Sequence, residues 1–377
     1  MSACGLIFSN IHDENISELT RLRTMASVPF MCRYRLIDFA LSNMVNSDIT
    51  NIGVITHYNY YSLMDHIGSG KDWDLARRSG GVRILPPYIT ASASGGNTLY
   101  QTRLEALKNI SFYIQRATED YIVMSDCDAI CNIDMRDIID DHIKNGADLT
   151  VVVKSVSLTR EAAAKNVIFE SNSDGQITDI FMQPASMTGQ KDVSLNIMVA
   201  SRAFLETQIL DAIAHNFNSF NRDIIGRNIN RRNLRVYRYD GYYSSVNSFA
   251  DYFAISMDLI SNEAHRKELF GNKNSPVFTK IRNSAPTKYS DNAVITNSLV
   301  ADGCTIEGTV ENSILFRGVH VAKNAVVRNS ILFQDTCVNK RASLNCVVSD
   351  KYSSIRDGRV LSGCDLAPFY ISKNTML

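Results

Sequence analysis

The sequence has no excess of charge of either sign, no long apolar run and few cysteines. Lys and Arg total 39, and Asp and Glu also total 39, so the formal net charge is zero. A protein that coats a nucleic-acid duplex carries a basic excess, and this chain has none. No window approaches the ~18 uninterrupted apolar residues that a membrane span needs. The first eight residues also lack the basic start of a secretory signal. We therefore expect no nucleic-acid partner and no membrane association.

Cysteine usage indicates a reducing compartment. Eight cysteines are scattered through 377 residues, too few for a disulfide scaffold in a chain long enough to bury an ample core. We expect reduced thiols and a cytoplasmic location. Hydrophobic residues make up 45% and charged residues 21%, which is typical of globular proteins and excludes wholesale disorder. At roughly 150 residues per domain, the length predicts about two to three domains.

Short apolar runs alternate with helical patterns through residues 1–260. The runs that are typical of buried parallel strands are residues 6–8, 52–56, 121–125 and 149–153. Helical patterns cover residues 100–107 and 135–145. This alternation predicts an α/β domain with a doubly wound, mostly parallel sheet, in which ligands lie beyond the carboxyl ends of the strands.

The pattern changes near residue 270. Two proline-containing stretches indicate a linker, which we place at residues 261–287. In residues 288–377 an Asn-Ser motif followed by two apolar residues recurs. Its copies begin at Asn297, Asn312, Asn329 and, in altered form, Asn345, at spacings of 15, 17 and 16 residues. Because short strands separate the copies and no helical period remains, we predict a parallel β-helix. The alternative, a β-sandwich, does not predict a shared motif at near-constant spacing.

Residues 35–43 read RLIDFALSN and resemble the glucose-1-phosphate adenylyltransferase family. The similarity continues through residues 46–47, 52–56, 73–75, 80–82 and 85–88. The C-terminal coils fit the same enzymes, so the resemblance covers nearly the whole chain. It implies a nucleotidyltransferase-like first domain and a left-handed β-helix as the second. The family joins ATP and glucose 1-phosphate to give ADP-glucose and pyrophosphate, the donor-forming step of bacterial glycogen synthesis.

The resemblance also locates positions at which catalytic members carry basic groups. Their glycine-rich loop falls on residues 10–16, which contain no glycine, and the arginine of that loop becomes Asn15. The lysine of a following lysine-proline pair becomes Met25. Asp13 and Glu14 would place carboxylates beside a triphosphate, where like charges repel. Glycine N–H groups and basic side chains stabilise a transferring phosphate, so three such supports are missing here.

The metal and sugar positions of the family are altered as well. The metal-binding aspartate survives as Asp126, but its second carboxylate becomes Ser245. Because Mg²⁺ usually takes one or two carboxylates together with substrate oxygens, Asp126 alone makes a weak, incomplete site. Asp128 lies two residues on, but strand alternation predicts that it faces elsewhere. The sugar-phosphate lysine becomes Gln183, and a glycine of the sugar pocket becomes Asn196. We expect no required cofactor, and Mg²⁺ only if residual activity exists.

This retained scaffold with missing catalytic groups resembles the GlgD-type partner subunits of the family. The resemblance implies a regulatory subunit, a pseudoenzyme with little or no activity alone. Its partner would be the catalytic subunit, in an allosteric heterotetramer, or a second copy of itself. Arg33 falls on a basic position that the family uses for sugar-phosphate activators, and Arg35 lies two residues on. As a hypothesis, the two guanidinium groups bind an effector phosphate; a solvated surface pair is the alternative.

Two other activities stay open at this point. The chain would be a feebly active adenylyltransferase if Asp126 still held a metal. It would be a β-helix acyltransferase if His320 acted as a general base on the coils, although that activity does not need the long α/β domain. The pair Arg231-Arg232 is interpreted as a solvated basic surface rather than a nucleic-acid patch.

Overall fold

The computed structural model describes residues 2–87 and 100–377, which fold as two compact units. The first unit comprises Met1–Ile11, Phe39–Ser245 and Lys273–Phe278, and the second comprises His12–Asp38, Val246–Asn272 and Thr279–Leu377. Tyr88, the last residue of one family-like segment, lies outside the described residues.

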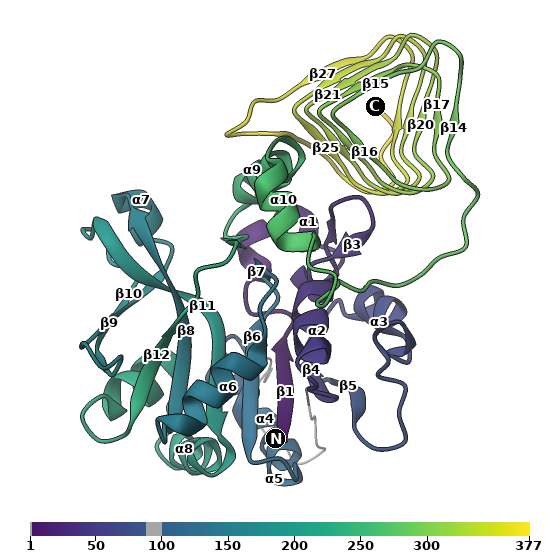
Figure 1. The fold of residues 1–377 in the computed structure, drawn as a ribbon. Helices are drawn as coiled ribbons and strands as arrows, with labels where there is room; N and C mark the ends of the chain where they lie inside the picture. The colour runs from purple at the N-terminus through teal and green to yellow at the C-terminus, as the bar shows by residue number, and fades with distance from the viewer. Residues whose placement is uncertain (1, 88–99) are drawn as a thin grey trace. The chain divides into compact units, whose positions relative to one another are not determined.

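A nine-stranded sheet forms the first unit (Figure 1). Its strands are β1 (Ala3–Phe8), β4 (Asn51–Ile55), β5 (Gly81–Leu85), β6 (Tyr121–Asp126), β8 (Leu149–Leu158), β9 (Val167–Ser171), β10 (Ile177–Met182), β11 (Gly189–Ser201) and β12 (Leu234–Arg238). The main path runs β10-β9-β11-β6-β1-β4-β5, and β8 joins β11 to β12. The neighbours from β6 to β5 are parallel, as the sequence predicts. β11 runs antiparallel to β6, β8 and β9, so the α/β sheet is confirmed and is mixed as a whole.

β1 occupies the middle of the parallel strands because its residues are apolar. Residues 4–8 are buried, with β4 on one side and β6 on the other. Phe8, at the carboxyl end of β1, lies opposite Ile55 of β4 and Asp126 of β6. The carboxyl ends of three parallel strands therefore meet at one edge, where open α/β sheets bind ligands.

Helices connect the strands of the first unit. Those that the structure describes are α2 (Ile37–Asn46), α3 (Tyr61–Ile67), α4 (Arg103–Asn109), α5 (Ser111–Gln115), α6 (Met135–Lys144), α7 (Arg160–Ala163) and α8 (Arg202–Ala214). α4 begins with a capping box, in which the Thr102 hydroxyl accepts from the N–H of Glu105 and the Glu105 carboxylate accepts from the N–H of Thr102. The capping box makes Arg103 the first residue of α4. Within the described part of the chain, every helix is too short or too polar to cross a bilayer.

The second unit contains a parallel β-helix of fifteen short strands in three sheets of five strands each (Figure 1). The strands are β14 (Lys288–Tyr289), β15 (Val294–Thr296), β16 (Leu299–Val300), β17 (Thr305–Ile306), β18 (Thr309–Glu311), β19 (Ile314–Leu315), β20 (His320–Val321), β21 (Val326–Arg328), β22 (Ile331–Leu332), β23 (Cys337–Val338), β24 (Ser343–Asn345), β25 (Val347–Ser349), β26 (Ser354–Ile355), β27 (Val360–Ser362) and β28 (Phe369–Ile371). Apolar residues of successive coils stack in register inside it, as Ile306, Val321, Val338 and Ile355 do. The solenoid predicted from the repeat is confirmed.

The repeated asparagines explain the spacing of the coils. Asn297, Asn312 and Asn329 have φ angles of 42°, 46° and 43°, in the left-handed region that asparagine tolerates better than most side chains. Asn297 Nδ2 donates to Asn312 Oδ1 at 2.8 Å, and Asn312 Nδ2 donates to Asn329 Oδ1 at 3.3 Å. The fourth copy is one residue out of the predicted register, because the left-handed residue there is Cys346 (φ 51°) and not Asn345. The structural spacings are therefore 15, 17 and 17 residues.

Two further segments belong to the second unit. They form α1 (Ser17–Thr20), β2 (Pro29–Phe30), β3 (Tyr34–Arg35), α9 (Phe249–Ser261) and α10 (Glu263–Phe270), the last within the stretch expected to be a linker. Tyr252 of α9 links all three parts of the unit. Its hydroxyl donates to the carbonyl of Pro29 at 2.7 Å, and its ring lies edge-on to Phe30 and to Phe333 of the solenoid, with centroids 6.1 and 6.5 Å away. Such aromatic packing adds to the stability gained from burial alone.

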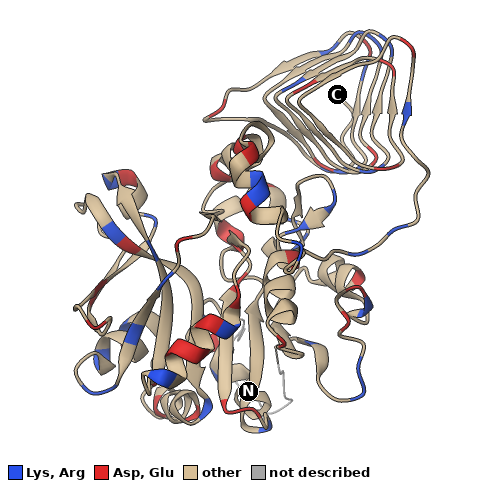
Figure 2. Ribbon diagram, in the orientation of Figure 1, with Lys and Arg blue, Asp and Glu red and all other residues tan. Residues whose placement is uncertain are grey.

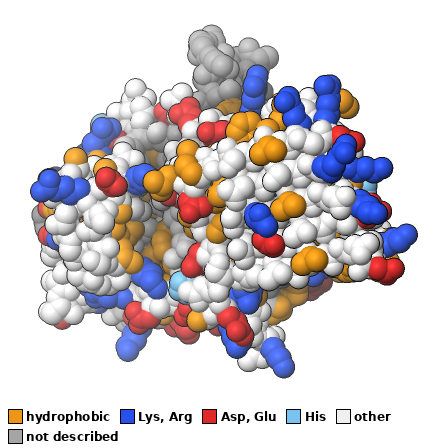
Figure 3. Space-filling model, turned by 90° about the horizontal axis from the view of Figure 1, so that it is seen from above, with side chains coloured by type: hydrophobic (Ala, Val, Ile, Leu, Met, Phe, Trp, Pro, Cys, Tyr) orange, Lys and Arg blue, Asp and Glu red, His pale blue; other side chains and the backbone are white. Residues whose placement is uncertain are grey.

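Charges of both signs occur on both units (Figure 2). In the space-filling view, hydrophobic, acidic and basic side chains are interspersed on the face that is shown (Figure 3). This mixing agrees with the zero net charge of the sequence. The eight cysteines all lie within the described residues, and none of them forms a disulfide bond there.

Candidate functional site

Asp126 lies at the carboxyl edge of the central strands, as the last residue of β6. Its side chain is fully buried, and its Oδ2 accepts a hydrogen bond from Arg103 Nη2 at 2.6 Å. The Arg103 side chain is itself only 8% exposed. A guanidinium group from the first turn of α4 therefore forms a charge-assisted contact with the one carboxylate that the sequence marks as a metal ligand.

Two further contacts hold the Arg103 guanidinium in place. Its Nη2 lies 3.3 Å from Asn196 Oδ1 on β11, and its central carbon lies 5.5 Å from the centroid of the Phe8 ring. Asn196 has a φ of 56°. The resemblance places a glycine at this position, and asparagine is among the side chains that best tolerate the left-handed conformation found there.

Asp128 is buried beside Asp126, and its Oδ2 accepts hydrogen bonds from Ser245 Oγ at 3.0 Å and from Asn196 Nδ2 at 3.4 Å. Carboxylate oxygens of the two aspartates lie within 4.8 Å of each other. The expectation that Asp128 faces elsewhere is wrong. Side chains two residues apart along a strand lie on the same face, so alternation gives no reason to separate Asp128 from Asp126. After Asp126 the chain leaves β6 and enters β7 (Ala129–Cys131). β7 pairs with β13 (Tyr243–Ser245), which brings Ser245 to this point.

Tyr243 of β13 adds a neutral donor to this group. Burial, with a further contribution from the Asp128 carboxylate, raises the pKa of Tyr243 well above its ordinary value of 10. Its hydroxyl therefore keeps its proton and donates to the carbonyl of Ser194 at 3.4 Å.

The segment that follows β1 is tied to the end of β4. Asn10 is buried, and its Oδ1 accepts from Thr56 Oγ1 at 2.7 Å and from the His57 N–H at 3.2 Å. Its Nδ2 donates to the carbonyl of Tyr58 at 3.4 Å. Burial lowers the pKa of His57 to about 4, so this imidazole is neutral near pH 7. Asn10, which occupies the first position of the family's glycine loop, thus uses its side chain to join two strand ends.

Comparisons with known proteins agree with this architecture. The nucleotidyl transferase family model matches residues 14–262, and a GlmU-like C-terminal hexapeptide model matches residues 284–369. The glycogen biosynthesis protein GlgD of Bacillus subtilis (strain 168) is 31% identical over 372 residues, which cover 98% of this chain and 95% of that protein. The chain belongs to the glucose-1-phosphate adenylyltransferase family.

Glucose-1-phosphate adenylyltransferases themselves are similarly close. The protein of Geobacillus stearothermophilus is 33% identical over 327 residues (86% of this chain and 82% of that protein). The protein of Halalkalibacterium halodurans is 32% identical over 326 residues (86% and 83%). The hexapeptide match, with the three parallel sheets, confirms the left-handed β-helix expected from the resemblance.

Asn15 and Met25, at which the resemblance places basic groups, belong to the second unit. Asn15 is exposed in a short 3-10 helix, and Met25 is buried. The N–H of Met25 donates to Asp13 Oδ1 at 2.7 Å. The Asp13 carboxylate is therefore buried and holds the turn at Met25.

In the first unit, Gln183 lies just beyond β10 and is exposed. Its φ is 51°, and its N–H donates to the carbonyl of Asn166 at 3.0 Å. The structure thus joins Asp126 and Ser245 in one hydrogen-bonded group, which runs through Arg103, Asn196 and Asp128. Reasoning from sequence missed Arg103, because a helical pattern does not distinguish a buried arginine from a surface one.

Mg²⁺ is the ion that the family implies at Asp126. The residues of this structure do not fit it. Asp126 Oδ2 faces the Arg103 guanidinium, and Asp128 Oδ2 accepts from Ser245 and Asn196. A divalent ion needs carboxylate oxygens turned toward it, and a fixed positive charge beside them repels it.

A group of basic residues gathers in the second unit. Burial, followed by the charges of Arg35, Arg23 and Arg282, lowers the pKa of Lys351 to about 7, while Asp350 acts in the opposite direction. Arg23, Arg35, Arg282 and Lys351 are called the basic cluster below.

The members of this group differ in exposure and pairing. Arg23 Nη2 donates to both carboxylate oxygens of Asp350, at 2.8 and 2.9 Å, and both side chains are 4% exposed. Arg35 is buried, whereas Arg33 is exposed, so the two arginines singled out in the sequence lie in different environments.

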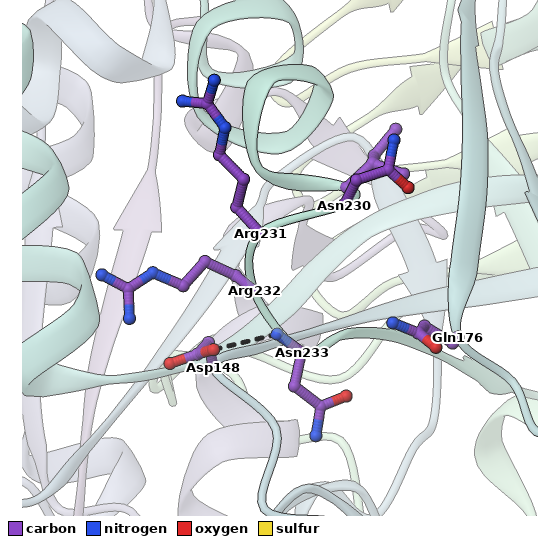
Figure 4. A pocket seen from close by; sticks show the side chains of 7 residues that line it. Asp148, Gln176, Asn230, Arg231, Arg232 and Asn233 are labelled. Atoms are coloured by element: carbon purple, nitrogen blue, oxygen red, sulfur yellow. Dashed lines mark hydrogen bonds between the residues drawn. The ribbon is translucent and has the colours of Figure 1, made fainter.

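Two remaining sequence candidates belong to neither of these groups. His320 of β20 is partly exposed and is flanked along the ladder by Thr305 and Cys337. An open pocket of about 430 Å³ in the first unit is lined by Asp148, Gln176, Ile229, Asn230, Arg231, Arg232 and Asn233 (Figure 4). The side chains of Arg231 and Arg232 are exposed and extend away from Gln176 (Figure 4). The pocket contains none of the residues around Asp126.

Proposed function

We propose that this chain is a regulatory subunit, inactive or weakly active alone, that assembles with a catalytic glucose-1-phosphate adenylyltransferase subunit in a heterotetramer. Its role would be to control ADP-glucose formation for glycogen in the cytoplasm, without a required cofactor. The observation that carries the proposal is the Arg103 guanidinium on the Asp126 carboxylate. The missing basic groups at Asn15, Met25 and Gln183 support it, as does the similarity to a protein named for glycogen biosynthesis. A scaffold without the groups for chemistry acts through its surfaces.

The surface that we propose for this assembly is the last coil of the solenoid. Among the described strands, β27 and β28 are the last in their sheets. Val360 and Leu366 of this coil are 73% and 88% exposed, and Phe369 is also exposed. An open strand edge next to exposed apolar side chains is a template for another chain. A catalytic subunit with the same kind of solenoid can extend these parallel sheets.

Co-expression with a catalytic subunit tests the proposal. A tag on this chain is expected to recover the catalytic subunit, and the complex is expected to differ from the catalytic subunit alone in kcat or in the KM for glucose 1-phosphate. Leu366→Lys is expected to lower recovery at least about tenfold, because it places a charge in an apolar contact. Tyr61→Lys on α3, also at a strongly exposed position, is the matched control.

Three results would contradict parts of the proposal. No recovery of the catalytic subunit by the wild-type chain, at any ratio of the two, would reject the assembly. Equal recovery by Leu366→Lys and Tyr61→Lys would place the contact elsewhere than the last coil. Recovery with unchanged kinetics would reject a regulatory role.

We also propose that the basic cluster, together with Arg33, binds the phosphate of a sugar-phosphate effector. Besides burial, the charges of Arg35, Arg23 and Arg282 act on Lys351 and lower its pKa, whereas Asp350 acts in the opposite direction. A phosphate dianion would compensate these positive charges through charge-assisted hydrogen bonds. An anion would also raise the pKa of Lys351 from about 7, because it stabilises the ammonium form.

Calorimetric titration with fructose 6-phosphate measures this binding. Lys351→Met is expected to weaken it about tenfold, which is typical of losing one charge-assisted hydrogen bond, and Arg33→Ala is expected to weaken it less. Lys323→Met, an exposed lysine of the solenoid, is the control. Identical heats for wild type, Lys351→Met and Arg33→Ala would remove the site.

The lowered pKa of Lys351 also predicts how the free energy of unfolding changes with pH. The pKa of Lys351 is about 7 in the folded chain, against an ordinary 10.5. Below pH 7 the lysine is charged in both states, so the folded state bears the full penalty of its charge. As pH rises toward 10.5 the unfolded chain binds more protons, and stability recovers. Lys351→Met is therefore expected to raise the midpoint of thermal unfolding more at pH 6 than at pH 9.

A further inference from the structure

We propose that Arg103 provides Asp126 with the positive charge that a divalent metal would otherwise supply, and that it thereby closes a latent metal site. Carboxylate oxygens of Asp126 and Asp128 lie within 4.8 Å of each other, and both side chains are buried. Two negative charges this close, away from water, repel strongly unless a cation lies beside them. Arg103 is that cation, at 2.6 Å from Asp126 Oδ2.

The local structure holds the Arg103 side chain in its buried position. The capping box of Thr102 and Glu105 fixes its place at the start of α4. Its guanidinium contacts a carboxylate, an amide oxygen and the Phe8 ring at the same time. An arginine keeps its charge at every pH at which the protein is folded. The guanidinium is therefore a permanent cation at this position.

The other donors around the two aspartates are neutral and can turn. Ser245 and Asn196 donate to Asp128 in this structure, but a hydroxyl group and an amide each also carry an oxygen that can accept. Without the guanidinium, two carboxylates, one amide oxygen and one hydroxyl would face the same space. Oxygen ligands of this kind are those that Mg²⁺ and Mn²⁺ prefer. Among the described residues, Arg103 is the one that we propose excludes the ion from this space.

Mn²⁺ binding, followed by electron paramagnetic resonance on the full-length chain, tests the inference. Wild type is expected to show no Mn²⁺ site that depends on Asp126. Arg103→Ser is expected to bind one Mn²⁺ per chain at least about tenfold more tightly than wild type, because a competing unit charge has gone. This site is expected to disappear in Arg103→Ser/Asp126→Asn. Arg202→Ser removes another arginine at the start of a helix, one paired with Glu206, and is expected to gain no site.

Other results would overturn the inference. A tight Mn²⁺ site in wild type that is lost in Asp126→Asn would show that Arg103 does not exclude the ion. A folded Arg103→Ser chain, with unchanged circular dichroism, that binds no Mn²⁺ would show that there is no latent site. Arg103→Met preserves the apolar stem over Phe8 and replaces Arg103→Ser if that variant does not fold.

Thermal unfolding of the wild-type chain gives an independent answer. Its midpoint is expected to be equal in Mg²⁺ and in EDTA, and a rise with Mg²⁺ that Asp126→Asn abolishes would contradict the inference. The inference concerns only the residues around Asp126 and Asp128 and does not rest on the proposed assembly. Mn²⁺ binding tests the inference about Arg103, and recovery of a catalytic subunit tests the proposed assembly.

Discussion

Purified without a partner, this chain is expected to form ADP-glucose at least about a thousandfold more slowly than an active family member, because several charge-stabilising groups are missing together. Loss of a single preorganised donor typically costs about 3–4 kcal/mol of transition-state stabilisation. The resemblance places an arginine, two lysines and a second carboxylate at the positions of Asn15, Met25, Gln183 and Ser245. Such losses do not add fully, so a thousandfold is a lower bound.

The measurement is pyrophosphate release from ATP and glucose 1-phosphate by protein made in a host that lacks the enzyme. Asp126→Ala serves as the control for contamination. Activity that survives Asp126→Ala belongs to another protein. Weak activity that disappears with it would establish the alternative of a feeble enzyme that uses Asp126. Turnover at the rate of an active relative would contradict the proposal altogether.

The sequence predicted the fold because the signals for it are local. An apolar strand such as β1, and a turn residue that recurs in each coil, are both visible in a short window. The fourth coil shows the limit of this reasoning. Asn345 is the asparagine that the repeated motif predicts at the turn, but the residue in the left-handed conformation is Cys346. The backbone conformation, and not the identity of the residue, sets the register of a coil.

The sequence predicted the candidate site only in part, because its decisive contacts join distant residues. The resemblance located Asp126 and Ser245, yet it said nothing of Arg103, which lies on another element. The direction of Asp128 was predicted wrongly, because residues two apart along a strand share a face, and Asp128 in fact lies close to Asp126. Charge pairs of this kind depend on where folding brings two elements together. The pattern of residues within each element does not contain that information.

Replacing Arg23 with methionine is expected to destabilise the second unit by about 3–5 kcal/mol, as removal of one partner from a buried ion pair typically does. Asp350, 327 residues away in sequence, would lose its buried ion-pair partner. The hydroxyl of Tyr370 still donates to Asp350 Oδ2 at 3.1 Å, which compensates only a fraction of the carboxylate charge. Arg23 also lies over the Phe333 ring, 6.0 Å from its centroid, and that contact would be lost.

Urea unfolding of the full-length chain, followed by the fluorescence of its tyrosines, measures the effect. The double variant Arg23→Met/Asp350→Leu is expected to recover most of the loss, because no buried charge is then left without a partner. Arg317→Met breaks a pair with Asp302 that is more exposed than the Arg23 pair, and about 1 kcal/mol or less is expected there. Equal losses for Arg23→Met and Arg317→Met would mean that burial does not set the strength of the Arg23 pair. A double variant as unstable as Arg23→Met would mean that packing of the methylene stem, and not the charge of Asp350, accounts for the loss.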